Sequence, residues 1–406
     1  MKKKPIRILH VVQRMEAAGL QSFIMNIYRT IDRSQMQFDF LTHYKERQFY
    51  DDEIERLGGR IYRLSVREDK NPVKYLKELK KFFREHQEYE IVHGHMDSLG
   101  LFYLEAAKLS GIDNRIAHAH TVIIGGDLKK RLRNLLNKGY KVNATCLLAC
   151  SEDAGMYMFG DSDFKVIHNP IDVQRFAYNE TVRNIVRAEL GVQDKIVIGH
   201  VGRFSYSKNH EFLLQIFQQI TKIEDRAVLV LVGQGELETE IHHQAKELGI
   251  EDRFFYLGVR ADVERLYQAF DSFVFPSRFE GLGIVAIEAQ AAGLPTVCSD
   301  SVPQFANATD LFTTMPLSAS SKEWAETVMD RINIGSRKGR SQELMDAGYD
   351  VNKVSVELIE LYGNMIGGGE GGGGVNVFLL LIPFIGSPAS GCLSTEQNSL
   401  SDRAAA

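Results

Sequence analysis

The sequence predicts an α/β protein made of two doubly wound domains that face each other across a central cleft. Short apolar runs alternate with amphipathic stretches along the whole chain, which is typical of parallel sheets covered by helices on both faces. With 406 residues, 44% of them apolar, the chain is long enough for two cores. The alternation breaks at Asn169-Pro170-Ile171-Asp172, where a polar stretch begins, so we place the domain boundary there.

Strands are expected wherever a short apolar run is bounded by polar or turn-forming residues. In the first half these runs cover residues 6–12, 37–42, 90–94, 115–119, 146–150 and 165–168. Apolar residues at helical spacing predict helices between them over 19–33, 73–86, 98–110 and 127–140. The second series of strands is expected near 195–202, 227–232, 254–257, 272–275 and 295–298.

The predicted domains are therefore residues 1–172 and 173–352, followed by a helix over 353–365 that packs back on the first domain. Residues 366–406 begin with a glycine-rich run, which is typical of a flexible tail. No run approaches about 20 apolar residues, and the basic start is followed by a run too short for a signal peptide. We therefore expect a cytoplasmic protein, and the net charge of -5 gives no support for a nucleic-acid partner.

Two glutamates, Glu280 and Glu288, bracket the glycine-rich start of a predicted helix, Gly281-Leu282-Gly283-Ile284. Free backbone amides and the positive end of the helix dipole at such a start suit a diphosphate. At roughly 1.5 Å rise per residue, Glu288 lies about two turns into the helix and Glu280 ahead of it. Each carboxylate can then accept hydrogen bonds from hydroxyl groups on one side of the diphosphate. Two solvated surface acids are the alternative interpretation.

Basic and glycine residues follow other strands of the second half. Arg203 and Lys208, in Gly202-Arg203-Phe204-Ser205-Tyr206-Ser207-Lys208, come directly after an apolar strand. An arginine can hold two phosphate oxygens at once and a lysine acts as a point charge, so the pair could neutralise a departing diphosphate. Gly233 and Gly235 follow the next strand, where glycine allows a close approach to a ligand or simply makes a tight turn.

The ordered series Gly202-Arg203 with Lys208, Val232-Gly233-Gln234-Gly235, Phe275-Pro276-Ser277 leading to Glu280 and Glu288, and Gly293-Leu294-Pro295 resembles glycosyltransferase family 4. The resemblance covers about residues 6–365. It implies the GT-B fold and a retaining transfer from a nucleotide sugar, and it is strongest to bacterial enzymes of capsular and exopolysaccharide assembly.

The resemblance also implies roles for individual residues. Arg203, Lys208, Glu280 and His120 would be catalytic. The donor would be bound by Gly19, Gly202, Gly233, Gly235, Gly281, Leu282, Gly283, Ile284 and Glu288. The family usually has two glycines and an acidic residue after the first strand, whereas this chain has only Gly19 and then Gln21. The phosphate contact at Gly19 is therefore expected without its detail.

Two His-x-His pairs occur at expected strand ends, His93-Gly94-His95 and His118-Ala119-His120. Because alternate residues of a strand point to one side of the sheet, four imidazoles could converge, as in a metal site. The resemblance instead places His120 beside the donor sugar, and we prefer that interpretation and expect no metal. His95 and His118 then shape the acceptor side or have a purely structural role.

Residues 127–141 form a basic stretch with leucines at helical spacing, including Lys129, Lys130, Arg131 and Arg133. Such a helix can rest on an anionic membrane surface, where each cation contributes about 1 kcal/mol, or it can be a solvated face over a core. Acceptors of the resembled family are usually lipid-linked, so we place these residues on the acceptor side and expect peripheral contact with the inner face of the plasma membrane.

The resulting hypothesis is a retaining, metal-independent hexosyl- or N-acetylhexosaminyltransferase. It would move a sugar from a nucleotide-sugar donor, a UDP-sugar by preference, to a lipid-linked saccharide in capsule or exopolysaccharide biosynthesis. Preorganised positive charge at the leaving diphosphate would be the main catalytic device. Two alternatives stay open: a non-catalytic nucleotide-sugar-binding subunit of a transferase, and a sugar-nucleotide epimerase on the same architecture. The oligomeric state is not indicated.

Overall fold

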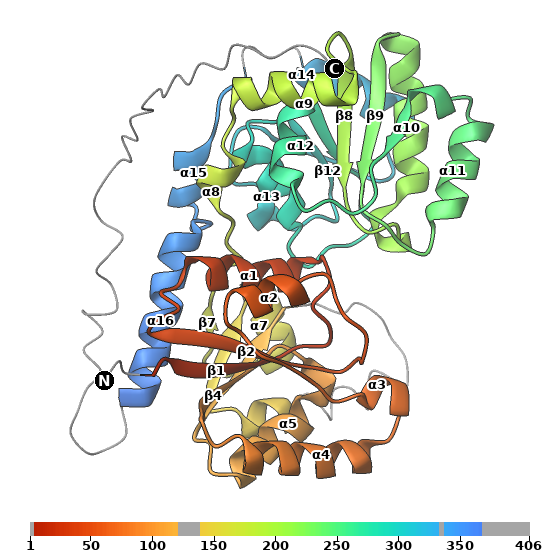
Figure 1. Cartoon of the computed structure of the whole chain (residues 1–406). Coiled ribbons are helices and arrows are strands. Elements are labelled where there is room, and N and C mark those ends of the chain that lie inside the picture. The colour runs from red at the N-terminus through yellow and green to blue at the C-terminus, as the bar shows by residue number, and fades with distance from the viewer. Residues whose placement is uncertain (1–3, 121–138, 333–336, 368–406) are drawn as a thin grey trace, which may run out of the picture.

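A computed structural model describes residues 4–120, 139–332 and 337–367 of the chain. Two α/β domains are stacked on each other, and each contains one sheet in which all the paired strands are parallel (Figure 1). The predicted fold class, two doubly wound Rossmann-like domains, is confirmed. The predicted helix over 127–140 falls largely, and the predicted tail almost wholly, outside the described residues.

The first sheet has seven strands in the order β3-β2-β1-β4-β5-β6-β7. Their bounds are β1 Ile6–Val11, β2 Met36–Thr42, β3 Ile61–Arg63, β4 Tyr89–Gly94, β5 Asn114–Ala119, β6 Cys146–Ala149 and β7 Lys165–Val166. The chain moves outward from β1 to β3 and then returns to place β4 on the other side of β1. Ligands of such sheets bind beyond the carboxyl ends of the strands at this switch point, here between β1 and β4.

The second sheet repeats this arrangement with six strands in the order β10-β9-β8-β11-β12-β13. Their bounds are β8 Ile196–Val201, β9 Ala227–Val232, β10 Phe254–Tyr256, β11 Ser272–Phe275, β12 Thr296–Ser299 and β13 Phe312–Met315. Every residue of β9 is buried, as expected for a central strand covered on both faces. The switch point lies between β8 and β11, so the loops after these two strands start at the same place.

Helices cover both sheets. In the first domain they are α1 Gly19–Thr30, α2 Asp51–Arg56, α3 Val66–Asp69, α4 Pro72–Glu85, α5 Asp97–Leu109 and α7 Glu152–Phe159. In the second they are α8 Val173–Phe176, α9 Glu180–Leu190, α10 His210–Ile223, α11 Glu238–Glu247, α12 Val263–Ala269, α13 Ile284–Ala291, α14 Ser321–Ile332 and α15 Ser341–Asp346. The start of helix α4 is determined by two residues. Pro72 stands in the first turn, and Asn71 Oδ1 accepts a hydrogen bond from the Lys74 backbone amide over 3.0 Å.

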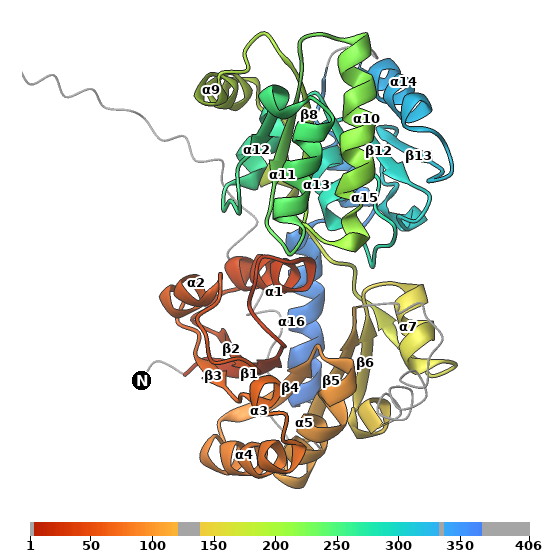
Figure 2. The ribbon, with the colours of Figure 1, turned by 90° about the vertical axis from the view of Figure 1, so that its right-hand side faces the viewer.

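The last helix, α16 Val351–Gly367, leaves the second domain and runs down the side of the first (Figure 2). Val354, Leu358 and Tyr362 are buried in the core that α1 shares with the first sheet. Lys165 Nζ on β7 also forms an ion pair with Glu357 Oε1 over 2.8 Å. The first domain is therefore completed by residues from the opposite end of the chain.

The structure contains elements that the sequence pattern did not predict. Strand β3 is three residues long and β13 pairs only through Phe312–Met315, at the two sheet edges. Helix α2, six residues long, lies between β2 and β3. Short edge elements carry too few apolar residues for periodicity to be visible, which is why they were missed.

Candidate active site

The two domains approach each other at the switch points of their sheets. A Cβ atom built on Gly19, at the start of α1, would lie 3.8 Å from Ile284 Cγ2 at the start of α13. One built on Gly281 would lie 3.3 Å from the carbonyl oxygen of His120, which follows β5. Residues predicted for the two halves of the site are thus brought together. The contact at Gly19 leaves room for a Cβ atom, whereas the backbone contact at Gly281 is tight and favours glycine.

The start of helix α13 has the features of an anion site. Gly283 is its N-cap with a φ of +75°, a conformation that favours glycine, and a Cβ there would meet Val302 Cγ1 at 3.2 Å. Among the described residues no side chain caps this end, and the first turn holds no acidic residue. The positive end of the helix dipole is therefore left for a ligand.

Lys208 and Glu280, predicted as separate contacts to donor phosphate and sugar, bind each other here. Lys208 Nζ lies 2.6 Å from Glu280 Oε1, and both side chains are largely buried. Two hydrogen bonds to backbone carbonyl groups hold their loops together. The Asn209 side chain donates through Nδ2 to the Pro276 carbonyl over 3.0 Å, and the Arg278 backbone amide donates to the Ser207 carbonyl over 2.7 Å. Sequence reasoning missed Asn209 and Arg278, because their partners lie about 70 residues away in the chain.

Glu288 is 8% exposed and receives a hydrogen bond from the Tyr267 hydroxyl group over 3.0 Å. Burial raises the pKa of this carboxyl to about 7, against the Tyr267 hydrogen bond, which lowers it. A buried carboxylate with one partner has remaining acceptor positions that ligand hydroxyl groups can fill. Tyr267 was not foreseen, since nothing in its local sequence distinguishes it from a core tyrosine.

Arg203 stands in a different environment from Lys208. Its side chain is 63% exposed and its Nη2 lies 3.3 Å from Glu236 Oε2, which is also exposed. A pair this open to water holds the guanidinium weakly. Arg203 is therefore free to turn toward an anion bound at the start of α13.

Gly233 and Gly235 have a structural explanation within the protein. A Cβ on Gly233, whose φ is +136°, would lie 2.0 Å from the Gly202 carbonyl oxygen. A Cβ on Gly235 would lie 2.2 Å from the Phe204 carbonyl oxygen. These glycines let the loop after β9 pack on the loop that carries Gly202 and Arg203, and their contact with a donor stays a prediction.

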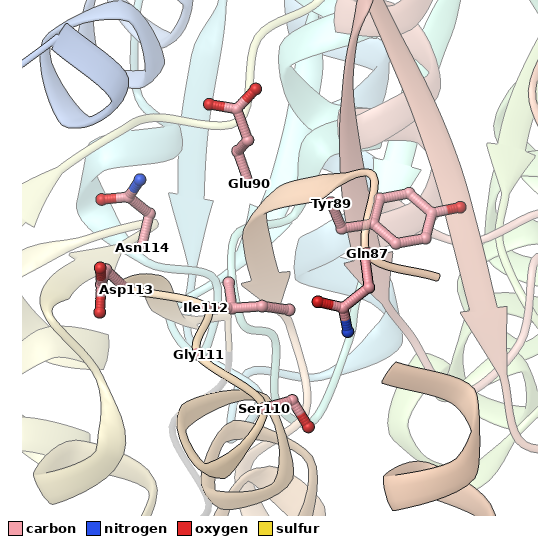
Figure 3. Close-up of a pocket in the computed structure, with 8 residues that line it drawn as sticks. All are labelled: Gln87, Tyr89, Glu90, Ser110, Gly111, Ile112, Asp113 and Asn114. Atoms are coloured by element: carbon pink, nitrogen blue, oxygen red, sulfur yellow. The ribbon is translucent and has the colours of Figure 1, made fainter. Parts of the chain in front are cut away.

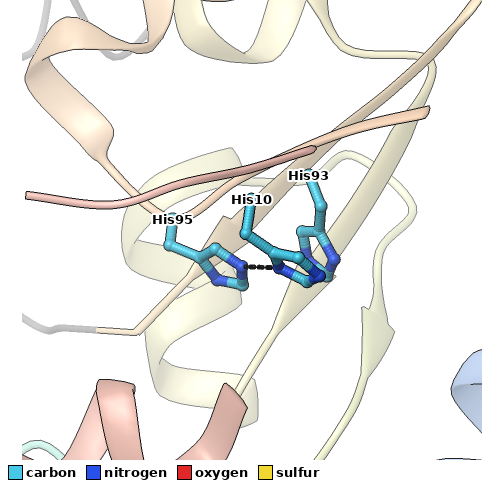
Figure 4. Close-up of side chains that lie close together, drawn as sticks. All are labelled: His10, His93 and His95. Carbon is cyan, nitrogen blue, oxygen red and sulfur yellow. Dashed lines mark hydrogen bonds between the residues drawn. The ribbon is translucent and has the colours of Figure 1, made fainter. Parts of the chain in front are cut away.

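The histidines of β4 and β5 do converge, and His10 of β1, which the sequence pattern did not single out, joins them. His10 Nδ1 lies 3.0 Å from His95 Nε2 (Figure 4), and His95 Nδ1 lies 2.9 Å from His120 Nε2. His95 and His118 are buried, so they lie within the domain, and their acceptor-side role stays a prediction. Ring nitrogens of His10, His93 and His95, and those of His95, His118 and His120, are close enough for a metal ion.

A pocket unrelated to these residues lies at the opposite edge of the first sheet (Figure 3). It is lined by Gln87, Tyr89, Glu90, Ser110, Gly111, Ile112, Asp113 and Asn114. Tyr89 begins β4 and Asn114 begins β5, so this pocket lies at the amino ends of the strands. Since ligands of doubly wound sheets bind beyond the carboxyl ends, we do not assign the reaction to it.

The predicted acceptor-side residues Lys129, Lys130, Arg131 and Arg133 lie outside the described residues. None of the helices that the structure describes is long and apolar enough to cross a membrane.

The fold and this interdomain site define a glycosyltransferase of the GT-B type. Residues 17–175 match the family model described as "Glycosyltransferase Family 4", and residues 182–313 match that of "Glycosyl transferases group 1". The chain belongs to this family. The Glycosyltransferase Family 4 model covers most of the first domain and the group 1 model most of the second, and the assignment of the acceptor to the first domain and of the donor to the second stays a prediction.

Relatives that match over most of their length point to polysaccharide enzymes. The chain is 35% identical over 368 residues to the putative glycosyltransferase EpsF of Bacillus subtilis, covering 88% of this chain and 96% of that protein. It is 25% identical to the capsular polysaccharide biosynthesis glycosyltransferase CapH of Staphylococcus aureus, over 88% and 98% of the two chains. The protein is thus a glycosyltransferase related to capsular and exopolysaccharide enzymes.

Two further comparisons bear on substrates. The chain is 28% identical over 249 residues to the UDP-Gal:alpha-D-GlcNAc-diphosphoundecaprenol alpha-1,3-galactosyltransferase of Escherichia coli, over 58% of this chain and 62% of that one. The crystal structure of Anabaena Alr3699/HepE in complex with UDP and glucose has the same fold, with a TM-score of 0.72 and 18% identity over 88% of this chain and 99% of that one.

Proposed function

We propose that the protein is a retaining, metal-independent transferase that moves a hexosyl or N-acetylhexosaminyl group from a UDP-sugar to a lipid-linked saccharide during capsule or exopolysaccharide assembly. One observation carries the proposal: the start of α13, which no described side chain caps, lies between Lys208, Glu280 and Glu288 on its own domain and Gly19 and His120 on the other. This arrangement offers positive charge for a diphosphate with hydrogen-bonding groups on either side.

In this proposal the diphosphate lies at the start of α13, where the amides of Gly281 to Ile284 and the Lys208 ammonium face it. Charge develops on the diphosphate as the bond to the anomeric carbon breaks, and preorganised donors stabilise that charge without reorganisation. Arg203, whose ion pair with Glu236 is exposed, completes the phosphate site by exchanging Glu236 for phosphate oxygens. This set of cations makes a metal ion unnecessary.

Glu288 would accept hydrogen bonds from the ribose hydroxyl groups, and Glu280 would contact the transferred sugar while still orienting Lys208. His120 would lie beside the sugar near the reacting carbon. The acceptor hydroxyl group attacks from the face that the leaving diphosphate occupies, and a diphosphate oxygen takes its proton. No general base on the protein is needed.

The donor and acceptor classes rest on relatives. The UDP complex of Anabaena Alr3699/HepE and the diphosphoundecaprenol acceptor in the name of the E. coli relative support UDP-sugars and lipid-linked acceptors for this chain. A lipid-linked acceptor would bring the protein to the inner face of the plasma membrane as a peripheral protein.

The test is a panel of UDP- and other nucleotide sugars, read out as nucleotide release with and without membrane extract, in buffer with and without EDTA. The proposal expects release only with extract, one preferred UDP-sugar, and no loss in EDTA. NMR of the product should show that the anomeric configuration of the donor is kept. An inverted product, or dependence on a divalent cation, contradicts the mechanism; nucleotide binding without turnover under every condition contradicts the enzymatic function.

A further inference from the structure

Five histidines and one tyrosine form two hydrogen-bonded chains inside the first domain. One chain joins Tyr362 Oη to His93 Nδ1 over 2.6 Å and His93 Nε2 to His118 Nδ1 over 3.1 Å. The other joins His10 Nδ1 to His95 Nε2 over 3.0 Å (Figure 4) and His95 Nδ1 to His120 Nε2 over 2.9 Å. The second chain therefore connects the buried core to the residue that meets the other domain.

These imidazoles are neutral at ordinary pH. Burial lowers the pKa of His10 and of His120 to about 3, and it lowers the pKa values of the other three well below the usual range. A neutral imidazole has one N–H donor and one acceptor nitrogen. A ring that uses both nitrogens, such as His95, must then donate at one and accept at the other. Each chain consequently runs in a single direction, and all of its tautomers change together.

The direction of the first chain is set by Tyr362. Among the described residues its hydroxyl group has no hydrogen-bond partner other than His93, and burial raises its pKa well above the usual value, so it keeps its proton. A buried hydroxyl that failed to donate would lose a hydrogen bond. Tyr362 therefore donates to His93 Nδ1, and His93 Nε2–H donates to His118.

The direction of the second chain is set at His10. Its Nε2 has no hydrogen-bond partner among the described residues, and its ring packs 4.2 Å from Phe38 and 5.8 Å from Phe40, centroid to centroid. An N–H group gains a weak interaction with the negative faces of aromatic rings, whereas a lone pair gains none. His10 therefore carries its proton on Nε2 and accepts at Nδ1 from His95 Nε2–H. His95 Nδ1 in turn accepts from His120 Nε2–H.

We propose that His95 and His10 are positioning residues that hold His120 as its Nε2–H tautomer, with Nδ1 left to accept a hydrogen bond from a hydroxyl group of the donor sugar. In the described structure Nδ1 of His120 is a buried ring nitrogen without a partner, so a sugar hydroxyl group reaches it only when the side chains around it move aside. The role of the sugar rests on the proposed function. We call this chain a tautomer lock, because its hydrogen bonds fix which ring nitrogen of His120 carries the proton. It does not conduct protons, since a proton accepted at His120 could not be released from the buried His10.

Nitrogen-15 NMR of histidine-labelled protein without ligand tests the lock directly, because the two ring nitrogens of each tautomer have distinct shifts. The lock predicts the Nε2–H form for His120. His10→Leu removes the group that accepts from His95, and since His10 is two hydrogen bonds away from His120, the variant should convert His120 to a mixture of tautomers. In His10→Asn the amide oxygen takes the place of Nδ1, so the Nε2–H form of His120 should be restored. Tyr362→Phe breaks only the other chain and serves as the matched control.

An Nδ1–H tautomer of His120 in the unaltered protein overturns the proposal, and so does a His10→Leu variant in which His120 is unchanged or changes no more than with Tyr362→Phe. One zinc ion bound per chain also overturns it, since a metal would occupy the lone pairs that the lock needs. His95→Gln provides a second variant should His10→Leu not fold: its amide reaches the His10 side and leaves His120 without a partner, so His120 should again be mixed.

Activity supplies the second readout. His10→Leu should lower kcat about tenfold, the effect of one lost hydrogen bond, while UDP binding stays unchanged, and His10→Asn should recover most of the loss. Equal loss in His10→Leu and His10→Asn contradicts the positioning role. A wild-type protein with no turnover defeats the proposed function but leaves the NMR result to decide the lock.

Discussion

Tyr267 donates a hydrogen bond to Glu288 over 3.0 Å, from Oη to Oε2, inside the core of the second domain. The carboxyl group is buried, and Tyr267 is its one hydrogen-bond partner in the described part of the chain, so its charged form is costly and its pKa is raised to about 7. A carboxylate buried in this way lowers the stability of the folded protein, but it offers free acceptor positions to hydroxyl groups of a ligand. Two predictions separate these effects.

Glu288→Gln should stabilise the protein in a pH-dependent way. Because the folded-state pKa of Glu288 is raised from 4.5 to about 7, the wild type is most stable below pH 4.5 with respect to this group and loses stability as the pH rises toward 7. The variant does not titrate, so its advantage should grow over that window by about 3 kcal/mol at pH 8. Urea unfolding at pH 5 and pH 8 measures it, and an advantage independent of pH would refute the raised pKa.

Glu288→Ala should weaken donor binding by about tenfold or more, because hydrogen bonds to a charged group are worth roughly 1.5 to 3 kcal/mol. Titration calorimetry with UDP measures the change. Glu247→Ala, which removes an exposed acid on α11, is the control and should bind UDP as the wild type does. Equal affinities for UDP in the two variants would remove Glu288 from the ribose site.

Lys208 and Glu280 should be coupled in stability. Each single alanine variant leaves a largely buried charge without its partner, whereas the double variant leaves none. A double-mutant cycle should therefore give a coupling energy of about 1 to 2 kcal/mol, measured by denaturant unfolding. Turnover should fall in all three variants, since two of them lack the Lys208 ammonium and the third lacks the Glu280 carboxylate that orients it. Additive stabilities would mean that the ion pair does not hold the site together.

Arg203→Ala should leave stability within about 0.5 kcal/mol, since its ion pair with Glu236 is exposed, yet lower both kcat and kcat/KM. The reason is that its contacts to phosphate strengthen as charge develops. Arg226→Ala removes an arginine of similar exposure, which pairs with the less exposed Glu224, and should not alter the kinetics. A change in KM alone for Arg203→Ala contradicts a role in the chemical step.

Gly283→Ala should lower the free energy of unfolding by about 1 to 2 kcal/mol, because its positive φ strains a residue with a side chain. It should also impair donor binding, because the new Cβ pushes against Val302 and shifts the backbone at the start of α13. Gly249→Ala is the matched control: its φ is +66° and no atom lies within 4 Å of the added carbon. It should show the strain alone, without an effect on the donor. Thermal unfolding and UDP titration of both variants distinguish the two contributions.

Much of the architecture was predictable because parallel strands buried on both faces appear as apolar runs, and those of β8, β9 and β11 were placed within a residue or two. The residues predicted for the donor site could be picked out because they belong to short motifs that follow the strands in a set order. The contacts between these residues could not be predicted. Lys208 and Glu280 are 72 residues apart in the chain, and Tyr267 on α12 contacts Glu288 on a different helix, α13. His10 was overlooked because a single histidine within an apolar strand carries no pattern.

Helix α16 gives the protein an order of assembly. Tyr362 and its neighbours fill the core of the first domain, although they are made after the whole of the second. During synthesis on the ribosome the second domain can fold while the core of the first domain still lacks helix α16. The hydrogen bond from Tyr362 to His93 can form only when α16 is in place, so a chain shortened before residue 351 should yield an intact second domain beside an unfinished first one.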